Sequence, residues 1–163
     1  IINFLKSLSK DYSVTIRLSP NDYDWNIKDR ILSNKFKCSI LIDRNKKFIN
    51  QLNKHDIIIC NYFGTTHLEA IAADMPTLIL YDITKEFFHS RAIENYVALE
   101  KVGVLHNSVN SLTNFLNSIK DNPLVWWESK LVRSALYNYK KIYSNVEHHW
   151  FEKWMMRLNQ KLN

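Results

Sequence analysis

Glycine is scarce in this sequence, with only two among 163 residues, at positions 64 and 103. Cysteine is equally rare: Cys38 and Cys60 each lie in an apolar run. Neither has the closely spaced second Cys or His that a zinc site requires, so the spacing excludes such a site. We expect two buried thiols in a reducing compartment.

Long apolar runs are also absent, and none approaches the roughly 20 residues that a membrane-spanning helix needs. The first residues contain neither a basic region nor a small-residue cleavage site, which argues against a signal peptide. The chain opens on Ile1 rather than Met, in the middle of a helical pattern. We therefore expect one domain that forms part of a longer protein.

The net charge is +6, with 22 Lys and Arg against 16 Asp and Glu. This balance favours anionic partners, such as phosphate-bearing substrates, an anionic membrane face or nucleic acid. No RNA-binding, zinc-finger or helix-turn-helix signature supports the last of these. The net charge alone therefore does not distinguish between these kinds of partner.

Strand-like and helix-like segments alternate along the chain, without an internal repeat. The periodicity predicts strands at about 12–18, 38–42, 56–61 and 77–82, with a short last strand near 102–106. Helical patterns lie between them, including 24–34 with Trp25 inward, 84–102 ending at Gly103, and 108–122 capped by Ser108. Alternation of this kind predicts an α/β fold with a Rossmann-like, doubly wound parallel sheet. We assign residues 1–122 to this unit and 123–163 to two further helices packing on it.

The scarce Gly64 falls at a strand-to-helix corner, in the stretch CNYFGTTHLE. Ligands of open α/β sheets bind beyond the carboxyl ends of the strands, where this corner should lie. Glycine lets a ligand approach the backbone, and the amides starting the next helix attract phosphate. Glu69, one turn deeper, is placed to bind a ribose hydroxyl. Phosphate and sugar sites side by side describe a nucleotide.

A simpler interpretation of the same residues stays open. Thr65 or Thr66 at the N-cap with Glu69 three or four residues later is close to a capping box, which stabilises a helix start without any ligand. Tyr62 and Phe63 flank the glycine and either stack on a base or pack on the neighbouring helix. His67 is expected at the exposed start of the helix.

The segment CNYFGTTHLEAIAADMPTLILYD resembles the nucleotide-side segment of GT-B glycosyltransferases. In particular it is similar to a bacterial family of transferases linked to surface-polysaccharide and O-antigen synthesis, distantly similar to CDP-glycerol glycerophosphotransferases. The matching positions in this stretch are Asn61, Tyr62, Gly64, Thr65, Thr66, Leu68, Glu69, Pro76 and Thr77. The stretches IRLSPNDYDW, VGVLHNS, NPLVWWES and HHWFEKWM extend the resemblance over almost the whole chain.

This resemblance implies the C-terminal, donor-binding half of a two-domain enzyme, whose acceptor-binding half is missing here. It also implies that transfer needs no bound metal, because helix N-termini and basic side chains meet the charge of the leaving group. Two departures stand out. Asn61 occupies a position where an acidic residue is frequent, which weakens any acid role there, and Asp24 replaces an expected glycine.

Further candidates lie outside the glycine corner. Arg17 follows the first strand and would bind a donor phosphate, or else form a surface ion pair. Arg91, after the fourth strand, is a second phosphate candidate, whereas Asp82 is expected to cap the next helix. His148 and His149 are adjacent on a predicted helix and so point in different directions, which does not suit one metal ion. We assign no catalytic base.

The C-terminal part is rich in tryptophan and basic residues. Trp150 and Trp154 stand four residues apart on a predicted helix, which favours anchoring of the tail to the domains. Contact with the inner face of the cytoplasmic membrane remains the alternative.

The leading hypothesis is therefore a cytoplasmic nucleotide-sugar-binding half of a glycosyltransferase-like enzyme in surface-polysaccharide synthesis. The donor-binding residues would be Arg17, Asn61, Tyr62, Gly64, Thr65, Thr66, Glu69 and Arg91. The alternatives are a non-catalytic α/β interaction domain and a basic nucleic-acid-binding α/β domain.

Overall fold

The computed structural model describes residues 1–19, 23–43, 47–85, 90–144 and 152. Helices and strands alternate along most of this length, as predicted, and the fold class is confirmed as α/β with parallel strands. The strands are β1 (Ser13–Ile16), β2 (Ser39–Ile42), β3 (Ile58–Cys60), β4 (Thr77–Leu80) and β5 (Leu105–His106). The helices are α1 (Ile2–Ser7), α2 (Ile27–Leu32), α3 (Ile49–Leu52), α4 (Thr65–Ala72), α5 (Ser90–Lys101), α6 (Val109–Ile119), α7 (Pro123–Trp127) and α8 (Lys130–Tyr143), with the 3-10 turn η1 (Ile83–Lys85).

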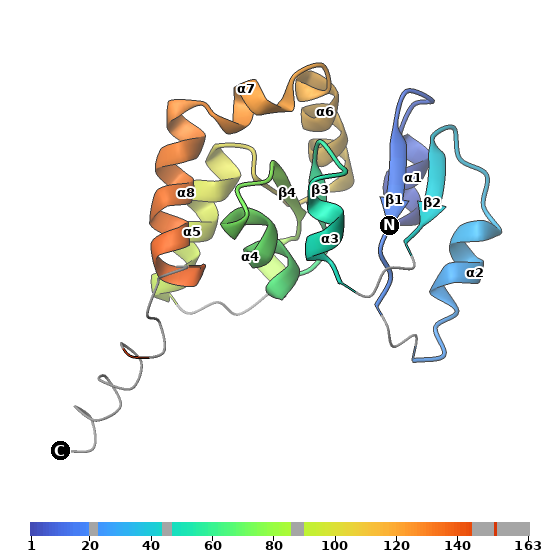
Figure 1. Ribbon diagram of the computed structural model, residues 1–163, viewed down its shortest axis with the longest axis horizontal. Coiled ribbons are helices and arrows are strands. Elements are labelled where there is room, and N and C mark those ends of the chain that lie inside the picture. The colour runs from blue at the N-terminus through green and yellow to red at the C-terminus, as the bar shows by residue number, and fades with distance from the viewer. Residues whose placement is uncertain (20–22, 44–46, 86–89, 145–151, 153–163) are drawn as a thin grey trace.

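The strands form two small sheets rather than one. β1 pairs with β2 and β3 with β4 (Figure 1), and β4 also pairs with β5 on its other edge, all in parallel. The first pair starts in register at Ser13 and Ser39, and the second at Ile58 and Thr77. Sequence analysis predicted all five strands but a single sheet, because edge-to-edge pairing has no signature in a lone sequence.

The three-stranded sheet forms the centre of the core. Thr77, Leu78 and Ile79 of β4 are completely buried, as expected for a parallel strand covered on both faces. One cluster of buried residues joins β4 to α4, α5, α7 and α8 through Ile79, Ile71, Leu99, Trp127 and Leu136. These helices gather at the end of the molecule away from β2 (Figure 1).

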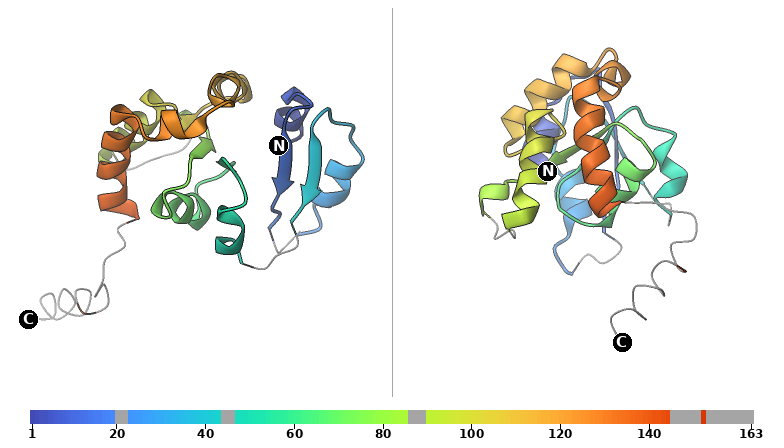
Figure 2. Two further views of the ribbon diagram at one scale, coloured as in Figure 1. Left: turned by 45° about the horizontal axis from the view of Figure 1, so that its top comes forward. Right: turned by 90° about the vertical axis from the view of Figure 1, so that its left-hand side faces the viewer.

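A second cluster of buried residues connects the two sheets. Leu5 and Leu8, in and just after α1, pack with Ile16 of β1, Leu78 of β4 and Leu112 of α6. Hydrogen bonds support the same junction, since the Ser7 hydroxyl lies 2.8 Å from that of Thr113. Figure 2 shows α1 and α6 from two further directions.

The turn after β1 departs from the prediction. The helix expected over 24–34 begins only at Ile27, and Trp25 is 63% exposed instead of facing inward. The cause is local: Tyr23, Asp24 and Asn26 have positive φ angles of 51°, 61° and 49°, which a right-handed helix cannot contain. Asp24 thus adopts the conformation that favours glycine, the residue expected at this position from the resemblance.

The helical part after Pro123 is divided differently from the prediction. A single helix was expected up to about residue 145, but α7 ends at Trp127 and α8 begins at Lys130. The side chains of Asn122 and Ser129 cap the two helices and so account for the separate starts. The second predicted helix, with His148, His149, Trp150 and Trp154, lies outside the described residues.

Two end signals were predicted correctly. Gly103 follows α5 with φ 77°, and the Ser108 hydroxyl accepts a hydrogen bond from the amide of Ser111 at the start of α6. Both cysteines are buried and unpaired, also as predicted. Burial raises the pKa of the Cys60 thiol to about 12.

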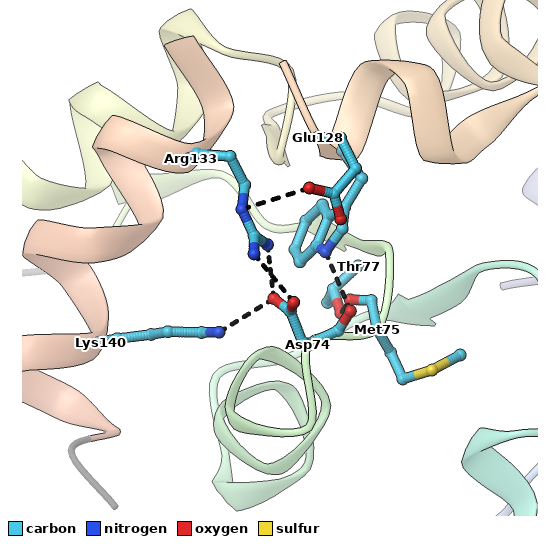
Figure 3. A network of polar contacts seen from close by, with 7 residues as sticks. Asp74, Met75, Thr77, Glu128, Arg133 and Lys140 are labelled. Carbon is cyan, nitrogen blue, oxygen red and sulfur yellow. Dashed lines mark hydrogen bonds and ion pairs between the residues drawn. The ribbon is translucent and has the colours of Figure 1, made fainter. Parts of the chain in front are cut away.

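An ion-pair network fixes α8 against the turn between α4 and β4 (Figure 3). Arg133 donates two hydrogen bonds to the Asp74 carboxylate, at 2.6 and 3.0 Å, and Lys140 donates another at 3.0 Å. The Trp127 indole N–H donates to the backbone carbonyl of Asp74. These cations hold the pKa of Asp74 at about 2, below its usual range. The network stabilises the amino-terminal side of β4, away from the glycine corner.

Candidate functional site

The glycine corner runs from Asn61 to Gly64, directly after β3, and leads into α4. Gly64 itself is the N-cap, so Thr65 and Thr66 occupy the first two helical positions. The predicted threonine capping box is therefore wrong, since neither threonine lies where its hydroxyl could cap the helix. Gly64 has no side chain, so the N-cap residue supplies no acceptor to the amides of the first turn of α4, while Nδ1 of His67 accepts a hydrogen bond from the amide of Gly64 itself. By contrast, Ser108, Asn122 and Ser129 cap α6, α7 and α8.

A close contact, and not the backbone angles, disfavours a side chain at Gly64. Its φ of −152° is extended backbone that any residue adopts. A Cβ added there would collide with the ring of Tyr62. The Tyr62 hydroxyl lies 3.4 Å from Oγ1 of Thr66, so the ring covers the glycine on the outer side of the helix start.

His67 is buried, although the sequence predicted it at the exposed start of the helix. Only 4% of it is exposed, because α4 turns this position toward α8. The amide of Gly64 donates to Nδ1 at 3.4 Å, and Nε2 lies 2.9 Å from the Tyr139 hydroxyl. An amide can only donate, so the ring proton resides on Nε2. Burial lowers the pKa of His67 to about 4, which keeps the imidazole neutral near pH 7.

Phe63 points away from the corner and into an aromatic group. Its ring centroid lies 4.4 Å from Tyr81, 4.8 Å from Tyr96 and 5.3 Å from His67. Its side chain therefore packs on the neighbouring elements, the second of the two roles considered for it. Tyr62 remains on the surface.

Glu69 lies on the outer face of α4 and is exposed. Its carboxylate makes no hydrogen bond or ion pair with any residue that the structure describes, whereas its backbone carbonyl accepts a hydrogen bond from the amide of Ala73. Four residues separate it from Thr65, which corresponds to roughly 6 Å along the helix axis. Its carboxylate is thus accessible, one turn beyond the uncapped amides.

Arg17 follows β1 at the carboxyl edge and binds the end of β2. Its Nη1 donates to Asp43 Oδ2 at 3.0 Å, and its guanidinium lies 5.9 Å from the centroid of the Phe48 ring. The Asp43 side chain is only 4% exposed, whereas that of Arg17 is 33% exposed. This ion pair joins the two strand ends and orients Arg17 there.

Asn61 lines a cavity of about 480 Å³ at the carboxyl edge of the strands. Trp25 and Arg30, which follow β1, also line it, together with residues 1–3. Among the predicted site residues whose side chains the structure describes, only Asn61 lines this cavity. Neither Trp25 nor Arg30 was among the residues predicted from the sequence, since the helical pattern placed Trp25 inward and Arg30 carries no distinctive motif. An arginine in the first helix after a βα corner was the available signal.

The remaining candidates have simpler roles or lie partly outside the description. Asp82 Oδ1 accepts hydrogen bonds from the amide and the hydroxyl of Thr84, so Asp82 caps the turn after β4 as predicted. Arg91 belongs to α5, but its side chain lies outside the described residues. No group of three or more His, Cys, Asp or Glu suited to a metal ion occurs among the described residues. The sequence does contain one Asp-x-Asp triplet, at 22–24, of which Asp22 lies outside the description.

A comparison with known protein families places the chain in one of them. A family model described as LIC12162 family transferase matches residues 2–158. The chain belongs to this family. No curated protein and no solved structure matches it.

Membership in the LIC12162 family makes the chain a transferase-family protein and agrees with the transferase resemblance of its sequence. The match extends beyond the described helices into the tryptophan-rich tail. Among the described residues, no helix combines the length and apolarity that crossing a membrane would require.

Proposed function

We propose that this chain is the donor-binding half of a glycosyltransferase-like enzyme that takes a nucleotide-activated sugar, in bacterial surface-polysaccharide synthesis. The uncapped start of α4 carries this proposal. It would bind the donor phosphates, Glu69 the ribose hydroxyls, and Arg30 would add positive charge from across the carboxyl edge. Membership in a transferase family and the GT-B resemblance support this class of reaction.

The chemistry of the corner is suited to such a donor. Amides at a helix start bind phosphate through hydrogen bonds and through the helix dipole. Thr65 is exposed at this start, and the carboxylate of Glu69 follows at a spacing that fits a pentose beside a phosphate. The Tyr62 ring lies over Gly64, so a phosphate bound against the glycine would displace it. The freed ring would then be available to stack on the base.

Titration calorimetry of the protein, extended to its full reading frame, with UDP, CDP and CMP tests the proposal. Glu69→Gln should weaken binding of the preferred nucleotide about tenfold, because a ribose hydrogen bond to a charged acceptor is lost. The matched control is Glu94→Gln, which changes an exposed glutamate of α5. Absence of nucleotide binding, or equal affinities of the two variants, would contradict the proposed donor site. Salt-dependent binding of RNA or DNA without preference for a nucleotide would favour the nucleic-acid alternative.

A further inference from the structure

β1 and β3 each have one paired and one unpaired edge. β1 pairs with β2 and β3 with β4, and among the described residues neither strand has a second neighbour. The two unpaired edges face each other between the sheets (Figures 1 and 2). Unpaired edges inside a domain are costly, because their amides and carbonyls need hydrogen-bond partners.

The pairing of β1 with β2, and of β3 with β4, determines which backbone amides and carbonyls face the gap. The carbonyl of Tyr12 accepts from Ser39 at the start of β2, and that of Ile16 accepts from the residue after β2. The amide of Ile58 donates to the residue before β4. Successive residues of a parallel strand direct their amides and carbonyls to opposite edges. Thr15 and Ile59 therefore direct theirs into the gap.

Both strands also run in the same direction. Asn61, just after β3, and Arg30, in the helix after β1, line one cavity, so the carboxyl ends of the two strands lie at the same edge. The gap thus lies between the edges of two parallel strands. A single further parallel strand could pair with both edges.

The position of α1 identifies the occupant. Residues 1–3 line the same cavity at the carboxyl edge, and α1 then leads back to the start of β1 with Phe4 and Leu5 in the core. A strand that enters a helix and returns into a parallel strand forms a right-handed crossover, with the two strands in one sheet. α1 is placed as the crossover helix of such a unit, whose first strand would lie beside β1.

We propose that a strand directly preceding α1 in the longer protein fills this gap and pairs with both β1 and β3. The two sheets then become one six-stranded parallel sheet, in the order β2, β1, inserted strand, β3, β4, β5. The turn from the inserted strand into α1 would border the cavity that Asn61 and Arg30 line. This inference does not rest on the proposed function.

An unsatisfied side chain beside the gap supports the same assignment. The Nε2 atom of Gln51, in α3, is buried and has no hydrogen-bond partner in the part of the chain that the structure describes. Gln51 and Thr15 line a second cavity, of about 610 Å³. Ile59 of β3 is 36% exposed. An inserted strand would cover Ile59, and a polar side chain on it would supply the acceptor that Gln51 requires.

The test measures amide hydrogen exchange by NMR, in the protein extended upstream to the start of its reading frame. The amides of Thr15 and Ile59 should exchange about 100-fold or more slowly than unpaired amides, at any protein concentration. The amides of Val14 and Cys60, which face the existing partner strands, are the internal controls and should be protected as well. The upstream sequence should contain a run of four to six β-branched or apolar residues within a short loop of Ile2.

Two results would overturn the proposal. Fast exchange at Thr15 and Ile59, with Val14 and Cys60 protected, would show that the gap stays open. Protection that grows with protein concentration would assign the gap to a second copy of the chain instead.

Discussion

The Nε2 atom of His67 and the hydroxyl of Tyr139 lie 2.9 Å apart in the protein interior, 72 residues apart in sequence. This contact ties the first turn of α4 to α8. Nδ1, the other ring nitrogen, accepts a hydrogen bond from the amide of Gly64. The buried histidine therefore links the glycine corner to the protein interior. The helices after Pro123 thus help to position the glycine corner, although they lie far from it in the sequence.

The burial of His67 predicts a pH-dependent stability. Its pKa is about 4 in the folded protein against 6.5 for the free side chain. Below pH 6.5 the unfolded chain therefore binds more protons than the folded one, and the free energy of unfolding falls as the pH is lowered from 7 through 4. The expected loss from this residue is about 3 kcal/mol by pH 4.

Urea unfolding of the wild type and of His67→Gln across this range isolates the histidine, since both proteins share the titrating carboxylates. The wild-type free energy should fall more steeply. Parallel curves would show that His67 is charged as easily in the folded state as in the unfolded one.

The ion pairs of Asp74 predict a second and separate effect. Asp74→Asn removes the charge but suits the positive φ of 60° at this position, so the backbone is retained. Because the carboxylate is partly exposed, solvent screening reduces the loss, which we expect to be about 1 kcal/mol at pH 7.

Asp24→Asn is the matched control, since Asp24 is also exposed with a positive φ of 61°. It should change the free energy of unfolding by less than about 0.5 kcal/mol. The depressed pKa of Asp74 makes its stabilisation complete above pH 3.8, and the difference from wild type should shrink as the pH falls from 3.8 through about 2. A difference that stays constant over this range would assign the effect to packing.

Replacing each of the two glycines by alanine should reduce the stability of the protein by different amounts. Gly103 has φ 77°, and an added Cβ would also collide with the Phe115 ring, so Gly103→Ala should destabilise the protein by about 1–3 kcal/mol. Gly64 has an extended φ and meets only the surface ring of Tyr62, which can rotate away. Gly64→Ala should therefore cost less than about 1 kcal/mol in thermal or urea unfolding. Equal losses would show that the Tyr62 ring is fixed.

The periodicity of the sequence was sufficient for the strands and the order of elements, because buried parallel strands such as 77–80 are continuous apolar runs. It was insufficient where single residues adopt positive φ angles. No proline or glycine stands beside Tyr23 and Asp24 to mark the turn. The start of the helix was therefore predicted three residues too early. The division of the strands into two sheets depends on edge pairing, which no local pattern encodes.

Asn61, Gly64 and Glu69 lie at or just beyond the carboxyl end of β3, where the sequence pattern placed them, and their role in donor binding stays a prediction. The burial of His67 was missed because its partner, Tyr139, comes from a distant helix. Arg30 was missed for a similar reason: its proximity to Asn61 arises from the packing of two separate βα corners.

Arg30 provides the last prediction. It is exposed, lines the cavity opposite Asn61, and makes no side-chain ion pair with the described residues. If this cavity receives the diphosphate of a donor, Arg30→Gln should weaken nucleoside diphosphate binding about tenfold, through loss of a charge-assisted hydrogen bond. The loss should shrink at high salt, because screening weakens the attraction in the wild type. Lys141→Gln, an exposed change on α8, removes the same charge far from the cavity and should leave the affinity unchanged. Equal effects of the two variants would mean that the net charge of +6, and not this cavity, attracts the nucleotide.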